Sequence, residues 1–222
     1  ATNYLAAVVS AVTSDQRVET VVLCGNSVDA LMHVSAERPG AILACVSPRR
    51  DGQSTPRHGS LGEMLILRAS APVLLVPVPT ARTLTLFGNV LLPLDGSLPA
   101  ETTLPLALTL AERSGATLNL ARVVASDGRG APQHQTSVSG AGASMEVEAK
   151  QINEAQTYLK RLADALRQRD VRATWEVRCG PPADEILRAT QTTNTNLLMV
   201  ATHGRGGVRP WTLGSVTESL VA

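Results

Sequence analysis

The sequence predicts an α/β protein in which helices cover parallel sheets, arranged as two copies of one unit. Apolar runs of strand length alternate along the chain with segments of helical periodicity, which is typical of βα units around a parallel sheet. The chain is also similar to itself at a spacing of 155 residues (179 minus 24), which indicates a repeat. The matched pairs include Cys24-Gly25 with Cys179-Gly180, Arg50 with Arg205, and Gly59-Ser60 with Gly214-Ser215. We therefore expect a partial first domain at 1–80 and a fuller second domain at 81–222.

The second copy shows the clearer order of elements. We expect strands at 90–94, 118–124, 173–177 and 197–200, and helices at 99–113, 147–169, 183–192 and from Ser215 onward. Pro105 would cost roughly 3 kcal/mol inside a regular helix, so the helix at 99–113 should kink there. Residues 125–144 are rich in Gly, Ser, Ala, Gln and Pro, and we expect disorder in this stretch, with a functional lid as the alternative.

The first copy supplies an element that the second lacks. After a helix at 60–68, the run from Pro72 to Pro77 predicts a last short strand that has no counterpart in the second copy. Conversely, the first copy has no counterpart to the stretch from residue 86 to the long helix, which holds the first two strands. We expect that the sequence is a trimmed piece of a two-domain protein, with a natural rearrangement as the alternative.

Charge and composition argue against several classes of partner. Lys and Arg number 20 against 19 Asp and Glu, and only 2% of residues are aromatic, so neither a phosphate-tracking surface nor a base-stacking platform is predicted. The longest apolar runs are far shorter than a membrane span and no signal peptide is visible, so we expect a cytoplasmic protein that binds neither nucleic acid nor membrane. Cys24, Cys45 and Cys179 show no metal-site spacing, and we expect reduced, mostly buried thiols.

The second copy has two candidate ligand loops. Asp95 follows the first strand, and the loop from Ala201 to Ser215 follows the fourth. In a sheet ordered 3-2-1-4-5 these two strands are neighbours, so both loops would line one crevice at the carboxyl edge. The glycines of the second loop would let its backbone amides approach an anion, and the helix that begins at Ser215 would add free N–H groups that favour phosphate.

The same residues also have explanations that involve no ligand. Gly206-Gly207 can form a flexible turn, and Ser215 with Glu218 forms an S-x-x-E capping box that starts a helix by itself. Loop arginines such as Arg205 and Arg209 are candidates to face phosphates, but solvated loop arginines are at least as common. No GxxxxGK[ST], GxGxxG or nucleophile elbow occurs, so the sequence predicts a binding site without a catalytic centre.

Three segments of the second copy resemble the universal stress protein family. They are V-L-L-P-L-D-G-S at 90–97, A-T-L-N-L-A-R-V at 116–123, and A-T-H-G at 201–204 followed by Gly214-Ser215, which is similar to the family's G-x2-G-x9-G-[ST] nucleotide motif. The resemblance implies an adenine-nucleotide α-hydrolase-like, doubly wound sheet ordered 3-2-1-4-5. It also implies ATP as the ligand, while the sequence leaves AMP or ADP open as alternatives. We expect Mg²⁺ to accompany ATP, because the cation would offset phosphate charge that only Arg205 and Arg209 could otherwise meet. One departure is Ala201, where the motif has its first glycine, and a need for positive φ there would strain the loop.

The resemblance assigns roles to individual residues of the second copy. Asp95 would meet the ribose or adenine, Val123 would lie against adenine, and Val200 would lie near the ribose. The loop and helix residues expected around the phosphates are Ala201, His203, Gly204, Arg205, Gly214, Ser215 and Val216. The corresponding loop of the first copy reads V-S-P-R at 46–49 and has lost the early motif glycines, so we expect that copy to bind no nucleotide.

Taken together, these residues lead us to expect an ATP-binding stress-response regulator or switch with slow or no hydrolysis. We also expect a homodimer, because Val73 to Val76 forms a short apolar strand whose open edge is a pairing template. A nucleotide-free dimerising scaffold is the main alternative, in which the glycine loop is only a turn. A third hypothesis is an ATP-consuming hydrolase or nucleotidyl transferase built on the same sheet.

Overall fold

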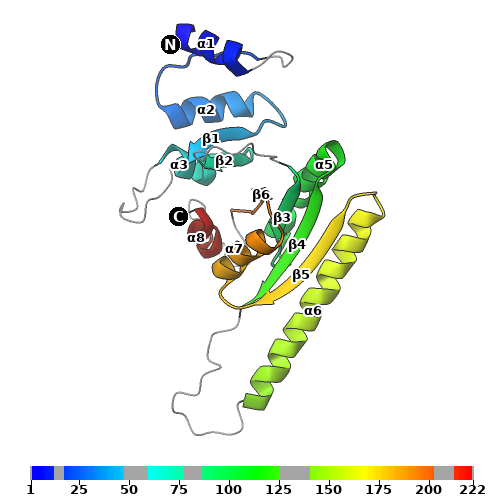
Figure 1. The fold of residues 1–222 in the computed structure, drawn as a ribbon. Coiled ribbons are helices and arrows are strands. Elements are labelled where there is room, and N and C mark those ends of the chain that lie inside the picture. The colour runs from blue at the N-terminus through cyan, green and yellow to red at the C-terminus, as the bar shows by residue number, and fades with distance from the viewer. Residues whose placement is uncertain are drawn as a thin grey trace. The chain divides into compact units, whose positions relative to one another are not determined.

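The chain divides into two compact units. The computed structural model describes residues 2–12, 18–47, 60–77, 87–125, 141–202 and 213–221. The two units are Ala1–Thr80 and Ala81–Ala222, which we call unit 1 and unit 2 (Figure 1). Each of them contains helices and a parallel sheet, so the α/β fold class predicted from the sequence is confirmed.

Unit 2 is built on a four-stranded parallel sheet. Its strands are β3 (Asn89–Pro93), β4 (Thr117–Val124), β5 (Ala173–Cys179) and β6 (Leu197–Leu198). Their order is β5-β4-β3-β6, and each neighbouring pair is parallel. In the unit's own numbering this is 3-2-1-4, so the first and fourth strands are neighbours as expected. β6 is shorter than the strand expected at 197–200, although the N–H of Met199 still donates to the carbonyl of Leu91 at 2.9 Å.

Helices cover both faces of this sheet. They are α4 (Leu98–Glu101), α5 (Leu104–Ser114), α6 (Ala141–Arg167), α7 (Pro182–Thr192) and α8 (Ser215–Val221). Successive strand residues point to opposite faces. One buried cluster contains Val90, Leu92, Leu118 and Leu120 with Ala107 of α5 and Leu159 of α6. The other contains Leu91 and Ala121 with Ile186 and Ala189 of α7, and Leu220 of α8 packs against it. Figure 1 shows the same division, with α6 on one side of the strands and α7 and α8 on the other.

The expected kink at Pro105 is wrong, because the chain forms two separate helices there. α4 ends at Glu101 and α5 begins at Leu104, so Pro105 lies in the first turn of α5, where its missing N–H is not needed. The hydroxyls of Thr102 and Thr103 donate to the carbonyls of Pro99 and Ala100 at 2.7 and 2.8 Å. These local hydrogen bonds satisfy carbonyls that the interrupted helix leaves open.

The long helix α6 has one buried face. Ala155, Leu159, Ala163 and Leu166 recur every three or four positions and are buried against the sheet. The helix begins at Ala141 rather than at 147, and it therefore takes in the end of the stretch for which disorder is expected. The rest of that stretch, 126–140, lies outside the described residues.

Unit 1 contains a shorter arrangement of the same kind. Its elements are α1 (Thr2–Val12), α2 (Ser27–Ala36), β1 (Leu43–Ser47), α3 (Leu61–Arg68) and β2 (Val73–Pro77). β1 and β2 are parallel neighbours. The Asn26 side chain caps α2 by accepting from the N–H of Val28 at 2.9 Å, and Ser60 caps α3 by accepting from the N–H of Glu63 at 3.3 Å. The segment 18–24, at the repeat position of β5, is exposed and forms no strand.

The expectation of mostly buried cysteines is wrong for two of the three. Cys24 and Cys179 are exposed, and Cys45 is half-buried. Cys24 lies in the segment of unit 1 that forms no strand, and Cys179 is the last residue of the edge strand β5, so neither side chain is fully covered. Partial burial raises the pKa of Cys179, as do the carboxylates of Glu148 and Glu185.

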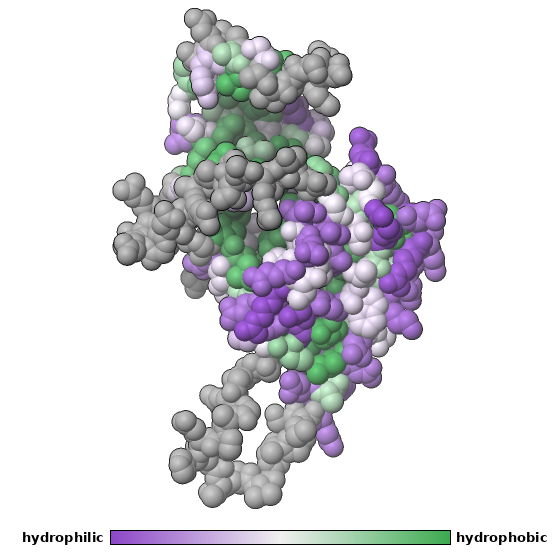
Figure 2. Space-filling model, viewed as in Figure 1, coloured by the Kyte–Doolittle hydropathy of each residue, from purple (hydrophilic) through white to green (hydrophobic). Residues whose placement is uncertain are grey.

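The visible surface of unit 2 is mainly polar. Figure 2 shows hydrophilic residues around α7 and the C-terminal half of α6, and a smaller hydrophobic area beside the N-terminal half of α6. Among the described helices, none combines the length and the apolar composition that crossing a membrane requires.

Candidate functional site

The carboxyl edge of the unit 2 sheet brings the predicted loops together. β3 pairs in parallel with β4 on one side and with β6 on the other. The residues that follow these strands therefore emerge at the same edge. Asp95 follows β3, Val123 is the second-to-last residue of β4, and Val200 and Ala201 follow β6. All four residues are half-buried. The structure thus places four of the predicted residues around one edge of the sheet.

Asp95 is held in a defined turn. Its Oδ1 accepts a hydrogen bond from the N–H of Ser97 at 2.9 Å, and Gly96 adopts a positive φ of 78°. The hydroxyl of Ser97 in turn accepts from the N–H of Ala100 at 3.3 Å and caps α4. This chain of local bonds fixes the direction of the carboxylate before any ligand arrives.

Val123 and Val216 share one face of the sheet. Both pack against the cluster of Leu91, Ala121, Ile186 and Ala189, between the sheet and the α7 and α8 layer. Val123 was expected on the adenine side and Val216 on the phosphate side of one ligand. The side chains of these two residues therefore border the same layer, although they come from segments far apart in the sequence.

The loop from Ala201 to Ser215 is closed at its base. The N–H of Gly214 donates to the carbonyl of Thr202 at 3.0 Å, and the hydroxyl of Thr217 donates to the carbonyl of Ala201 at 3.0 Å. These bonds bring the start of α8 next to the end of β6. The predicted site residues His203, Gly204 and Arg205, and also Arg209, lie outside the described residues.

Alanine at position 201 causes no backbone strain. Among the described residues other than glycine, only Asp170 and Asn194 have a positive φ. Ala201 therefore has an ordinary backbone conformation, and the glycine of the family motif is not needed there for conformational reasons.

Ser215 does not form the capping box that its sequence allows. The N–H of Glu218 donates to the carbonyl of Gly214 at 2.9 Å, so the first helical bond of α8 uses the backbone of Gly214. The Ser215 hydroxyl is exposed and has no hydrogen-bond partner in the described part of the chain. At the repeat position in unit 1, Ser60 is a true N-cap. The Ser215 hydroxyl, at the end of the loop, therefore makes no hydrogen bond within the described chain, and we call it uncommitted.

The sequence did not reveal two clusters of charged side chains near this edge. In the first, the hydroxyl of Tyr158 on α6 donates to Glu101 at 2.8 Å, and the guanidinium of Arg122 lies 5.5 Å from the centre of the Tyr158 ring. Burial and then the Glu101 carboxylate raise the pKa of Tyr158 far above its ordinary value. Helical spacing indicated that Tyr158 is on the buried face of α6, but no sequence signal links it to Glu101.

The second cluster lies between β5 and α7. Nε of Arg178 donates to Glu185 at 2.8 Å, and Nη1 of Arg178 donates to Glu176 at 3.2 Å. Nη1 of Arg188 reaches the other oxygen of Glu185 at 2.6 Å. The Arg178 guanidinium holds the pKa of Glu185 below its ordinary value. Alternating residues of one strand carry Glu176 and Arg178, but the partner on α7 could not be predicted from spacing.

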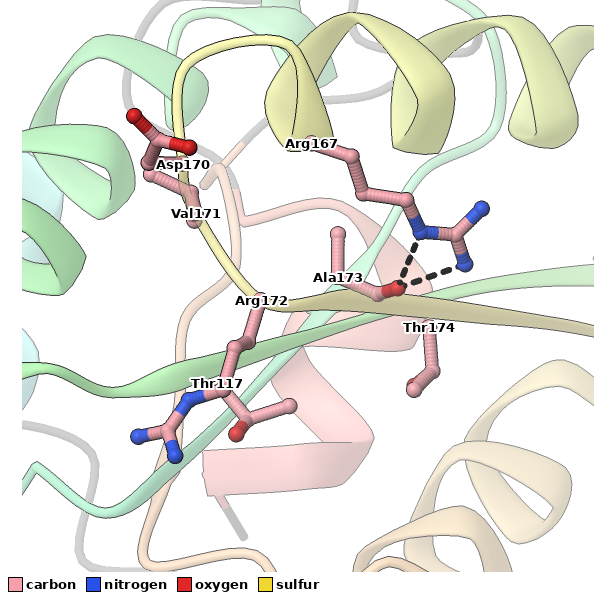
Figure 3. Close-up of a pocket in the computed structure, with 7 residues that line it drawn as sticks. All are labelled: Thr117, Arg167, Asp170, Val171, Arg172, Ala173 and Thr174. Carbon is pink, nitrogen blue, oxygen red and sulfur yellow. Dashed lines mark hydrogen bonds between the residues drawn. The ribbon is translucent and has the colours of Figure 1, made fainter.

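A hollow at the opposite edge of the sheet is explained by structural contacts. It is shallow and lined by Thr117, Arg167, Asp170, Val171, Arg172, Ala173 and Thr174 (Figure 3). Arg167 donates twice to the carbonyl of Ala173, at 3.0 and 2.7 Å, and Arg172 donates to the carbonyl of Gly115. These arginines bind backbone groups at the amino ends of β4 and β5, away from the predicted site.

Comparison with known proteins identifies the family. Residues 86–222 match the Universal stress protein family, and the chain belongs to this family. The resemblance found in the sequence is therefore confirmed. A comparison with curated protein sequences gives no significant match.

Solved structures of similar fold include three universal stress proteins. A UspA protein from Lactobacillus plantarum has 17% identity and a TM-score of 0.51, with 61% of this chain and 90% of that chain covered. A protein from Archaeoglobus fulgidus has 20% identity and a TM-score of 0.60, covering 87% and 60%. A putative universal stress protein from Pseudomonas aeruginosa has 18% identity and a TM-score of 0.62, covering 99% and 73%. At these identities the likeness concerns the fold.

Proposed function

We propose that unit 2 binds ATP and acts as a stress-response regulator or switch, with slow or no hydrolysis. The observation that supports this most directly is the uncommitted Ser215 hydroxyl beside the closed base of the loop. Ser215 is the first residue of α8 and its hydroxyl is exposed, whereas the equivalent Ser60 in unit 1 is the N-cap that uses its hydroxyl on the helix backbone. Membership of the universal stress protein family supports a stress-related role.

Each end of the nucleotide has residues suited to it. The fixed carboxylate of Asp95 is an acceptor for ribose or adenine hydrogen bonds, and Val123 and Val200 supply apolar surface for the base and sugar. At the phosphate end, the Ser215 hydroxyl and the N–H groups at the start of α8 are donors. We propose that Gly204, with Gly214 and Val216, lets the backbone approach the phosphates, and that His203 and Arg205 contribute from the loop.

Mg²⁺ would accompany the phosphates rather than occupy a protein cage. The described residues include no group of three His, Cys, Asp or Glu side chains that could hold a metal ion. Mg²⁺ commonly binds through substrate phosphates and water with only one or two protein carboxylates, and its role would be to offset phosphate charge. Phosphate oxygens and water would supply the ligands in this mode, and Asp95 stays assigned to the ribose or adenine.

Unit 1 would not bind nucleotide and would serve structure or assembly. Its Ser60 hydroxyl is used by the α3 cap, and its loop lacks the early motif glycines. β2 is a short apolar strand with β1 on one side, so its other edge is a template for a homodimer. We therefore propose that the protein is a tandem repeat of one fold and that it forms a homodimer.

The test is the stoichiometry of binding. Titration calorimetry of the purified chain with ATP and Mg²⁺ should give one site per chain. A stoichiometry near two would show that unit 1 also binds. The absence of any heat or thermal shift at millimolar ATP would refute the nucleotide site and favour a nucleotide-free scaffold.

A further inference from the structure

The strand β5 lies at an edge of the unit 2 sheet and, within the described part of the chain, pairs with β4 on one side only. The residues of a strand direct their backbone N–H and C=O groups alternately to its two sides. The carbonyl of Arg172 and the N–H of Gly180 both bond to β4, at 2.9 and 3.1 Å. The backbone groups of the even-numbered residues therefore point to β4, and those of the odd-numbered residues point outward. The residues of β5 with outward backbone groups are Ala173, Trp175, Val177 and Cys179.

One end of this outer edge is covered and the rest is open. Arg167, the last residue of α6, donates from Nε and Nη2 to the outward carbonyl of Ala173 at 3.0 and 2.7 Å (Figure 3). The guanidinium therefore occupies the start of the edge. Farther along, the outward N–H and C=O groups of Trp175, Val177 and Cys179 have no hydrogen-bond partner among the described residues. An open row of this kind is a template for another strand.

A second copy of β5 fits this edge in an antiparallel register centred on Val177. On the two-fold axis Val177 is opposite Val177 of the second copy, and on either side Trp175 is opposite Cys179. Each of these opposed pairs can exchange two backbone hydrogen bonds. Between them, Glu176 is directly opposite Arg178 of the second copy, and opposite charges at such positions favour pairing. Because Glu176 and Arg178 also bond each other within one chain at 3.2 Å, the axis generates a ring of four alternating charges.

The end of this register is complementary as well. Ala173 is then opposite Pro181, which has no N–H to donate. The carbonyl of Ala173 needs no donor from the second copy, because Arg167 already supplies one. The covered carbonyl thus meets a residue that lacks a donor.

Neighbouring registers are disfavoured by charge or by the covered carbonyl. An axis at Glu176 or at Arg178 places like charges directly opposite each other. An axis at Trp175 requires the outward carbonyl of Ala173 to accept from the second copy, but Arg167 holds this carbonyl. The edge therefore specifies one register with its own second copy.

We propose that two copies of the chain pair through their β5 strands, antiparallel and with the two-fold axis at Val177. The two unit 2 sheets then form one continuous sheet whose halves run in opposite directions, so the two carboxyl edges lie at opposite ends of it. This interface is separate from the β2 edge proposed above and does not depend on nucleotide binding. A chain that uses both edges forms assemblies larger than a dimer.

The first test is disulfide crosslinking at the axis. Val177→Cys should form a disulfide-linked dimer on mild oxidation, because the Cα atoms of an opposed pair are about 5.5 Å apart, within the range that a disulfide spans. Thr174→Cys is the matched control, since Thr174 lies on the same strand and is more exposed, but its two copies would be about 20 Å apart in this register. Both variants are made in a chain that carries Cys24→Ser, Cys45→Ala and Cys179→Ser. If Val177→Cys does not crosslink, or crosslinks no faster than Thr174→Cys, the proposal is overturned.

The second test removes one backbone donor. The N–H of Val177 points outward, so Val177→Pro leaves the pairing of β5 with β4 intact and removes the central hydrogen bonds between the two copies. Analytical ultracentrifugation should show self-association at least about tenfold weaker than in the unaltered protein, the effect of one lost hydrogen bond. Val177→Ala keeps the N–H and should retain the association, which separates the hydrogen bond from side-chain packing.

The edge of β2 is untouched in all these variants, so pairing there cannot produce a difference between them. Melting curves show whether Val177→Pro is folded. A folded Val177→Pro that associates as strongly as Val177→Ala would overturn the proposal, and if this variant does not fold, the crosslinking result decides.

Discussion

Two serines at equivalent positions of the repeat allow helix capping to be tested separately from the proposed ligand binding. Ser60 accepts the N–H of Glu63 at 3.3 Å, whereas at Ser215 the corresponding N–H of Glu218 is bound by the Gly214 carbonyl. Replacing an N-cap serine with alanine typically costs about 1 kcal/mol. We therefore expect Ser60→Ala to destabilise α3 by about 0.5 to 1 kcal/mol, toward the lower end because its hydrogen bond is long.

Ser215→Ala should behave differently. It removes no hydrogen bond of the described chain, so the stability of α8 should change by less than about 0.5 kcal/mol. If the hydroxyl binds a phosphate oxygen, ATP affinity should fall by about 1.5 to 3 kcal/mol, the range for hydrogen bonds to charged groups. Ser60→Ala should leave ATP affinity unchanged.

Two measurements on Ser60→Ala and Ser215→Ala decide whether Ser215 caps α8 or binds ATP. Hydrogen exchange of the amides in α3 and α8 reports the local stability of each helix, and titration calorimetry reports ATP affinity. The reasoning is refuted if Ser215→Ala accelerates exchange in α8 as Ser60→Ala does in α3 while ATP affinity stays constant. In that case Ser215 is a cap, and the nucleotide proposal loses its main support.

Three further perturbations test the site and the fold. Asp95→Ala should weaken ATP binding by roughly 1 to 3 kcal/mol, measured by calorimetry. Asp95→Asn keeps an oxygen that can accept the Ser97 N–H, so comparing the two variants separates the effect of the negative charge from that of the turn. Folding lowers the pKa of Glu185, so its ionised carboxylate stabilises the fold above the unfolded pKa near 4.3, and this stabilisation is lost as pH falls through the folded pKa. In urea unfolding, the unaltered protein should therefore lose more stability between about pH 5 and 3 than Glu185→Gln does. Equal losses would contradict this. Leu159→Ala should cost roughly 2 to 5 kcal/mol of unit 2 stability in the same assay, because Leu159 is fully buried between α6 and the sheet.

Light scattering tests the proposed dimer. The protein should show a concentration-dependent increase in mass, because β2 presents an edge that pairs with nothing in the described chain. A constant monomer mass over a wide concentration range would contradict it.

The fold was predictable where apolar patterns dominate the energetics. The run from Val90 to Leu94 is buried on both faces, and such a run defines a central parallel strand without help from its partners. Details that depend on polar side chains were less accessible. At the break before Pro105, the hydroxyls of Thr102 and Thr103 bond backbone carbonyls. The periodicity of apolar residues takes no account of such hydrogen bonds. The exposure of Cys24 depends on whether a neighbouring strand covers its segment, which composition does not show.

The candidate site was predictable to the extent that strand order determines it. Once the first and fourth strands are neighbours, Asp95 and Ala201 must emerge at one edge. Whether Ser215 caps α8 was not predictable, because S-x-x-E fits both a cap and a ligand site, and only the bond from Glu218 to Gly214 shows that Ser215 is not the cap. The Arg178 cluster joins two elements through side chains, and nothing in the spacing predicts such ion pairs.

The hydrogen bonds that close the base of the glycine loop also bear on how the protein can be altered. The bond from the N–H of Gly214 to the carbonyl of Thr202 holds the two ends of this loop together. Closing a loop of twice the length costs only about 0.6 kcal/mol more. We therefore expect variants that lengthen the loop between Thr202 and Gly214 to lose little stability, so the length of this loop can be varied while the sheet is kept.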